Sequence, residues 1–120
     1  GRMIKGLWRE TEGGIELSLH GHAKREKEGT DYACSKVSAL SQALAYGVLE
    51  FFYQDSHGGS YYYNSSHGDF KLSVKFGSMA EVEKRELMAM FSVALYGLDI
   101  VATQYENSIV IAREKLKEKC

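Results

Sequence analysis

Cys34 and His22 are the two residues of this chain whose types and spacing best suit covalent chemistry. Cys34 follows Asp31 by three residues, and an aspartate in that place is a favoured N-cap of a helix. A cysteine in the first helical turn lies near unpaired backbone N–H groups and the positive end of the helix dipole, which favour the nucleophilic thiolate. This position favours a reactive thiol over the usual alternative, a buried structural cysteine.

His22 is the candidate base for that thiol. It lies one residue past Gly21, where an expected strand ends and the chain enters a polar segment. A strand end beside a helix start is a common way to bring a base within hydrogen-bond reach of a nucleophile. The alternative is an ordinary histidine at a strand end, because the sequence alone does not show that the two side chains meet.

A zinc site is a second interpretation of the same residues. His20 and His22 would lie on one face of a strand, and Cys34 with His57 or His67 could complete a ligand set. No other cysteine or histidine stands at a short ligand spacing from Cys34, so we expect neither a metal ion nor another cofactor. His57 and His67 stand beside glycines and are expected in exposed turns.

Charge and composition argue against several other functions. The chain has 15 basic and 16 acidic residues, which gives no large electrostatic attraction for nucleic acid or an anionic membrane. The run Tyr61-Tyr62-Tyr63 could stack bases, but it lacks neighbouring basic residues, so we expect its alternate rings to reach a core. Two cysteines are a poor disulfide framework, and Cys120 is expected to be an exposed thiol without function.

The elements that must position these side chains follow from the periodicity of the sequence. Segments 3–9 and 15–20 predict a β-hairpin, because apolar and polar residues alternate in the second of them. Segment 21–30 is highly charged and is expected to be a solvated, mobile loop. A second hairpin is predicted from strands at 60–64 and 69–76, and the last strand at 109–112.

Two longer segments predict helices. From Asp31 to Phe51, apolar residues recur at steps of three or four. Ser78 with Glu81 forms a capping box for a second helix that ends near Gln104. The residues expected on the buried stripes are Val37, Leu40, Leu44, Val48 and Phe51 in the first helix, and Val82, Leu87, Phe91, Leu95, Leu98 and Ala102 in the second.

The order of these elements predicts an α+β fold with two layers, in which two long helices pack on one face of a mostly antiparallel sheet. A chain of 120 residues suits one domain, expected at 3–114, with a charged tail at 115–120. Residues 1–2 are expected to be the remnant of an expression tag. No uninterrupted apolar stretch approaches the ~20 residues of a membrane span, so a soluble cytoplasmic protein is expected.

Residues 21–23 (GHA) and 29–40 (GTDYACSKVSAL) resemble the motif of the ribosomal-processing cysteine protease (Prp) family. That family has Gly-His-Ala at the end of its second strand and Gly-x-Asp-x-x-Cys-x-x-Val-Ser-Ala-Leu at the start of its first long helix. Every fixed position is present here, and segment 97–105 resembles the family's closing segment more weakly. Departures from the family pattern are Tyr32, Ser35, Lys36 and Glu106.

The resemblance implies a cytoplasmic bacterial peptidase, typically a homodimer, that removes a short N-terminal extension from a ribosomal large-subunit protein by cutting after an aromatic residue. It implies that Cys34 is the nucleophile and His22 the general base, with Gly21, Asp31 and Ser38 at motif positions close to them. Backbone N–H groups at the helix start could hold the oxyanion of the tetrahedral intermediate.

Two functions of other classes stay open beside this hypothesis. One is a non-catalytic domain that binds a ribosomal or other basic peptide while Cys34 is packed. The other is a thiol redox or acyl-carrier role for Cys34. No direct partner among nucleic acids or membranes is expected in any of these cases.

Overall fold

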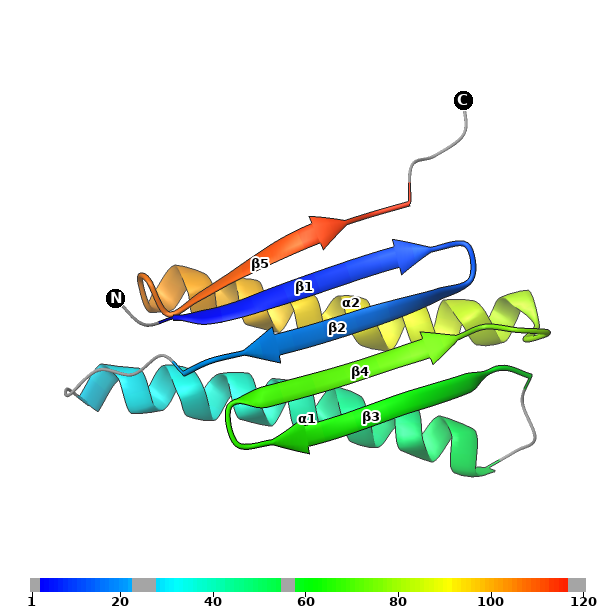
Figure 1. Cartoon of the computed structure of the whole chain (residues 1–120), viewed down its shortest axis with the longest axis horizontal. Coiled ribbons are helices and arrows are strands. Elements are labelled where there is room, and N and C mark those ends of the chain that lie inside the picture. Colours follow the sequence, from blue (N-terminus) through cyan, green and yellow to red (C-terminus); the bar gives the residue numbers. More distant parts are fainter. Residues whose placement is uncertain (1–2, 23–27, 55–57, 117–120) are drawn as a thin grey trace.

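The computed structural model describes residues 3–22, 28–54 and 58–116, and for 28–31 it describes the backbone alone. In this part of the chain five strands form one sheet, and two long helices cover one of its faces (Figure 1). This confirms the predicted two-layer α+β fold. In chain order the elements are β1 Ile4–Thr11, β2 Gly14–His20, α1 Glu28–Gln54, β3 Ser60–Ser66, β4 Asp69–Lys75, α2 Glu81–Gln104 and β5 Ile109–Glu114.

The sheet has the strand order β3-β4-β2-β1-β5, and it is antiparallel except for the pairing of β1 with β5. The two hairpins are therefore joined side by side through β2 and β4. Their register runs from Gly14 opposite Lys75 to His20 opposite Asp69. The turn before β4 consequently lies beside the segment that leaves β2.

The hydrophobic core lies between the sheet and the two helices. Alternate residues of β2 and β4 face the helices and are buried, among them Leu17 and Leu72. Trp8 of β1 is 1% exposed, and its ring meets Phe91 of α2 edge-on with centroids 5.9 Å apart. Burying such large apolar side chains supplies most of the stabilisation available to a domain of this size.

Two glycines allow α1 and α2 to pack closely. A Cβ built on Gly97 would lie 2.6 Å from Cδ2 of Leu40, and one built on Gly47 would lie 3.1 Å from the sulfur of Met90. Any larger residue at position 97 would therefore push directly against the branched end of Leu40. The missing side chains at these two positions permit the observed spacing of the helices.

The starts of both helices differ from the prediction. α1 begins at Glu28, so Asp31 is inside the helix and the N-cap assigned to it is wrong. Glutamate near the N-terminus favours helix formation, and one glycine inside a helix costs only about 1 kcal/mol, so position 29 does not end it. The capping box at Ser78 is also wrong: α2 begins at Glu81, and the amide of Ala80 donates to the Glu83 carboxylate at 3.1 Å.

The buried stripes are confirmed except at Val82, with Leu40 and Ala102 partly buried against the core. Val82 is 71% exposed, because it lies in the first turn of α2 on the side away from the sheet. By length and composition α2 is the one described helix that could cross a membrane. In this fold one side of it packs on the sheet through residues such as Leu87, Phe91 and Leu98, which is the pattern of a core helix.

Part of the expected loop at 21–30 is helical, because 28–30 belong to α1. Residues 23–27, His57 and Cys120 lie outside the described residues. The turn that we expected at 65–68 is shorter, since β3 continues to Ser66.

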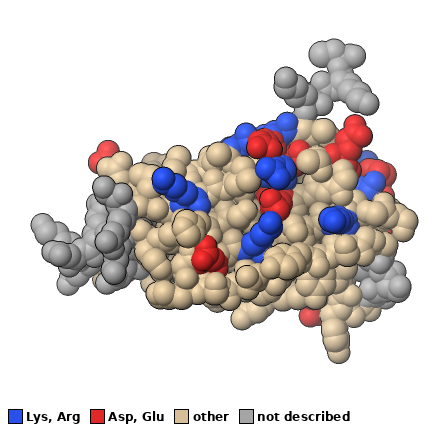
Figure 2. All heavy atoms as spheres, viewed as in Figure 1, with Lys and Arg blue, Asp and Glu red and all other residues tan. Residues whose placement is uncertain are grey.

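The open face of the sheet carries acidic and basic side chains interspersed with one another (Figure 2). Arg9 lies 2.9 Å from Glu114 and 3.8 Å from Glu16, and Lys71 lies 3.6 Å from Glu16. The hydrogen bond from Arg9 to Glu114 raises the pKa of the guanidinium above its usual value. These pairs link β5, β1, β2 and β4 and leave charges of both signs on this face.

Candidate active site

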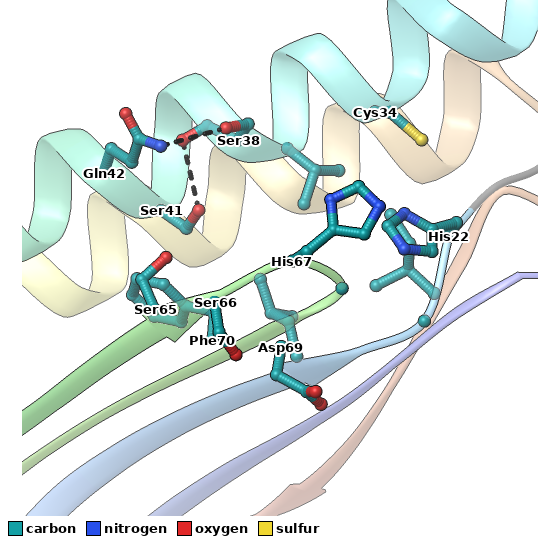
Figure 3. Close-up of a pocket in the computed structure, with 15 residues that line it drawn as sticks. His22, Cys34, Ser38, Ser41, Gln42, Ser65, Ser66, His67, Asp69 and Phe70 are labelled. Carbon is teal, nitrogen blue, oxygen red and sulfur yellow. Dashed lines mark hydrogen bonds between the residues drawn. The ribbon is translucent and has the colours of Figure 1, made fainter.

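A pocket of about 490 Å³ lies between α1 and the β3–β4 turn, beside the end of β2 (Figure 3). The structure places His22 and Cys34 on its wall, together with Gly21 and Ser38. Four of the five residues that the sequence assigned to the site therefore share one pocket. The side chain of the fifth, Asp31, lies outside the described residues, and its backbone is in α1.

His22 is positioned by the way the chain leaves β2. Gly21 has a φ of +102°, which favours glycine, and a Cβ there would lie 3.0 Å from the carbonyl oxygen of Met3. The amide of Gly21 donates a hydrogen bond to the carbonyl of Gly68 at 2.8 Å. This bond fixes the end of β2 to the β3–β4 turn and brings His22 into the pocket.

Gly68 lies directly against the ring of His22. Its φ is +80°, and a Cβ built on it would lie 2.7 Å from Nε2 of His22. The glycine is thus required both by the turn conformation and by the space that the imidazole occupies. Its missing side chain leaves room for His22 to sit where it does.

Cys34 projects from α1, and its sulfur points toward the space that the rings of His22 and His67 also face (Figure 3). The residue is half-buried and packs against the core. Because α1 begins at Glu28, Cys34 lies past the first helical turn, where the unpaired N–H groups are found. The prediction that those groups act on Cys34 is therefore wrong.

Ser38 follows Cys34 along α1 and continues the same wall of the pocket (Figure 3). Its hydroxyl accepts a hydrogen bond from the side-chain amide of Gln42 at 3.2 Å, and its carbonyl accepts one from the hydroxyl of Ser41 at 3.1 Å. Across the pocket, Ser65 presents another hydroxyl from β3. This end of the pocket is polar and able to hydrogen-bond to a peptide.

The deeper part of the pocket is apolar. Ile4, Leu19, Val37 and Phe70 line it there with apolar side chains that belong to the core or border it. A pocket with an apolar floor and convergent polar groups is typical of a ligand-binding site. The arrangement suits a peptide that carries one apolar side chain.

His67 lines this pocket, although we expected only an exposed turn residue there. It is exposed, as predicted, but its ring lies against that of His22 with centroids 4.7 Å apart. The sequence shows no periodicity at this turn. The pairing of β2 with β4 brings it to His22, and a correct prediction of the strand order would have identified it.

The residues considered for zinc are brought together only in part: His22, Cys34 and His67 line one pocket, and His20 lies apart from them. His20 lies on the open face, where its Nδ1 contacts the carboxylate of Asp69, and it does not line the pocket that holds Cys34. Among the residues that the structure describes, no group of three histidines, cysteines or carboxylates could hold a metal ion. Among the described residues, His20 is therefore missing from the ligand set that the zinc interpretation required.

The chemistry that the pocket can support is nucleophilic attack by a thiol with an imidazole as the proton carrier. In the described part of the chain, no hydrogen bond joins Cys34 to His22 or His67. Catalytic hydrogen bonds are often long in a ligand-free enzyme and shorten when substrate binds, so this geometry is compatible with a catalytic pair.

Comparison with known proteins supports the same chemistry. A family model described as cysteine protease Prp matches residues 3–110. The crystal structure of SMU.848 from Streptococcus mutans has a TM-score of 0.65 and 19% identity, with 95% of this chain and 96% of that chain covered. No curated protein matches the chain.

Two further structures are of the essential ribosomal processing protease Prp from Staphylococcus aureus. One holds a covalently linked product peptide and has a TM-score of 0.68. The other holds a substrate peptide and has a TM-score of 0.65. Each is 18% identical to this chain, and each match covers 93% of this chain and 100% of the S. aureus chain. At this level of identity, the similarity shows a shared fold.

Proposed function

Because the chain belongs to the Prp family of cysteine proteases, we propose that it cleaves peptides with Cys34 as nucleophile and His22 as general base. The observation that carries the proposal is the shared pocket: a thiol from α1 and a histidine from the end of β2 both line it. A non-catalytic peptide-binding domain with a packed Cys34 is the alternative, and it gives no reason for this pairing.

In the proposed mechanism His22 takes the proton of the Cys34 thiol, and the resulting thiolate attacks the scissile carbonyl carbon to form a tetrahedral intermediate. His22 then protonates the leaving amine as the C–N bond breaks, which leaves a thioester on Cys34. His22 next takes a proton from water, and the resulting hydroxide attacks the thioester. The acid product leaves and the thiol is restored, so no cofactor is consumed.

The negative oxygen of the tetrahedral intermediate needs a hydrogen-bond donor. Cys34 is the seventh residue of α1, so its own amide belongs to the regular helical hydrogen-bonding pattern. We place the Ser38 hydroxyl in this role instead, because it lies one turn further along the same wall and already accepts a bond from Gln42. That bond orients the hydroxyl and leaves its proton free to be donated.

We propose that the substrate is the short N-terminal extension of a bacterial ribosomal large-subunit protein, cut after an aromatic residue in the cytoplasm. The S. aureus ribosomal processing protease, which shares the fold, was crystallised with a substrate peptide. The apolar floor formed by Ile4, Leu19 and Phe70 suits an aromatic side chain before the cut. The polar end at Ser38 and Ser65 suits hydrogen bonds to the main chain of the peptide.

The test is to incubate the protein with a peptide that carries an aromatic residue at the end of a short extension, and to identify the products by mass spectrometry. We expect one cut after the aromatic residue and none with Cys34→Ala. In a Cys120→Ser background, where Cys34 is the remaining thiol of the chain, iodoacetamide should alkylate it readily at mildly acidic pH. Slow alkylation together with uncut peptide would favour the packed, non-catalytic alternative.

We further propose that the protein is a homodimer that pairs through the outer surface of its helices. Tyr46, Val93 and Tyr96 are each about two-thirds exposed there. Val93 lines an apolar groove of about 560 Å³ that also includes Ala43 and Met90. Large exposed apolar patches commonly mark interaction surfaces.

Sedimentation equilibrium tests the pairing. The parent should have twice the 13.5 kDa mass of the chain, and Val93→Glu should shift it toward the monomer. Tyr62→Glu is the control, because Tyr62 is exposed on the opposite face of the sheet. A monomeric parent would refute the proposal.

A further inference from the structure

His67 lines the pocket, and its contacts have no role in the chemistry described so far. It forms the tip of the β3–β4 hairpin, and its imidazole is tilted by 43° against that of His22 with 4.7 Å between the ring centroids. Ring pairs at such separations attract one another beyond the simple burial of area. The contact joins the proposed base to a different hairpin.

This contact follows from the strand register. β2 and β4 pair antiparallel, with His20 opposite Asp69 at the end of the ladder. The next step of the same ladder is the hydrogen bond from Gly21 to Gly68, and the step after it sets His22 beside His67. The position of His67 is therefore fixed by the seven residue pairs that join β2 to β4.

The ring of His22 is held between two parts of the same turn. Gly68 lies against its Nε2 edge, where a Cβ would come within 2.7 Å, and His67 packs on the ring. Among the described residues, no hydrogen bond reaches the ring of His22. Among the contacts that the structure describes, packing against this turn is therefore the one that orients the ring of His22.

We propose that His67 is a positioning residue for His22, and that it acts through ring packing and not through proton transfer. This inference rests on the proposed function, since it gives the base an orienting partner in the place where other cysteine and serine hydrolases use a hydrogen-bonded side chain. A base that is misplaced by about 1 Å loses roughly a hundredfold in rate, so an orienting contact has a measurable effect.

The kinetic test compares His67→Ala with His67→Phe, because phenylalanine keeps a ring and removes both nitrogens. We expect the alanine variant to lose about 10- to 100-fold in kcat with KM changed by less than about threefold, and the phenylalanine variant to recover most of that loss. His20→Ala is the matched control: it removes an exposed imidazole two steps along the ladder from His22, outside the pocket, and should retain parental kcat.

An NMR experiment tests the orientation without any substrate. The parent should show a nuclear Overhauser effect between the Gly68 Hα protons and the His22 ring, because these groups are in contact. The effect should disappear in His67→Ala and persist in His67→Phe, while circular dichroism shows that both variants remain folded. If the parent cleaves no peptide, the proposed function fails, and this experiment still decides the role of His67.

Three results would overturn the inference. His67→Ala with parental kcat would show that the ring contact has no effect on the reaction. His67→Phe as impaired as His67→Ala would show that a nitrogen of His67 is required, which indicates a polar role. An unchanged Overhauser effect in His67→Ala would show that His22 is oriented by something else.

Discussion

Gly68→Ala is the substitution that most directly tests how the site is built. Gly68 has a φ of +80°, and its Cα faces the imidazole of His22. The new methyl group would lie 2.7 Å from Nε2, 3.3 Å from Cε1 and 3.4 Å from Cδ2 of that ring. It therefore creates two separate effects, strain in the turn and displacement of the ring, which can be measured separately.

The size of both effects follows from the geometry. An alanine at positive φ costs about 1–2 kcal/mol of unfolding free energy. To restore an ordinary contact of 3.4 Å, Nε2 must move by about 0.7 Å, which approaches the 1 Å misplacement that costs about a hundredfold in rate. We therefore expect kcat/KM to fall by about 30- to 100-fold, a larger effect than the strain alone can cause in a folded protein.

The assay combines peptide cleavage with thermal unfolding of each variant. Gly13→Ala is the control, since Gly13 lies in the β1–β2 turn and a Cβ there meets its nearest atom, Oγ1 of Thr11, at 3.9 Å. It should keep parental activity. The reasoning is refuted if Gly68→Ala is destabilised as expected but cleaves at the parental rate, because His22 would then tolerate displacement.

The remaining predictions concern the site and the core. Cys34→Ala and His22→Ala should each abolish peptide cleavage while the circular dichroism spectrum stays native. The double variant should be hardly worse than either single variant. A Cys34→Ala protein with parental turnover would exclude the proposed nucleophile. Gly47→Ala should raise the free energy of unfolding by up to about 1 kcal/mol, because the flexible sulfur of Met90 can move aside. Gly97→Ala should be less stable than Gly47→Ala by at least about 1 kcal/mol in urea denaturation, because its new methyl group meets both methyl groups of Leu40. Equal stabilities of the two variants would contradict the proposed helix contact. Phe91→Ala should lower stability by about 3–5 kcal/mol, measured by the fluorescence of Trp8, the single tryptophan, whereas Val82→Ala should change it by less than about 0.5 kcal/mol.

The fold could be predicted from the sequence because its segments have clear and different periods. Leu17 and Leu72 belong to alternating patterns, and Leu44 and Leu95 belong to stripes with steps of three or four, so strands and helices were assigned correctly. The order of the strands was not predicted. The alternation of apolar and polar residues indicates which face of a strand is buried, but it does not indicate which strands of the two hairpins are neighbours.

The helix starts were predicted less well than the helices. Both errors came from assigning a cap to a polar residue with the right spacing, Asp31 in one case and Ser78 in the other. A residue type favours a cap by about 1 kcal/mol, and neighbouring residues that favour helix can outweigh it. α1 continues through Gly29 toward its N-terminus, and α2 begins only after Ala80.

The strand order, which was not predicted, also explains why the residues around the base were missed while the base itself was found. His22 and Cys34 lie in segments that the sequence identifies by local pattern, but His67 and Gly68 become neighbours of His22 only through the pairing of β2 with β4. Side chains alternate along a strand, so a register shift of one residue would place Gly68 opposite His22 and turn the adjacent side chains to the other face of the sheet. The buried side chains of Leu19 and Phe70 oppose such a shift, because it would expose them to water. The hydrophobic core thus fixes the position of the pocket wall, and the geometry of the proposed catalytic pair depends on the same apolar residues that form the floor of the pocket.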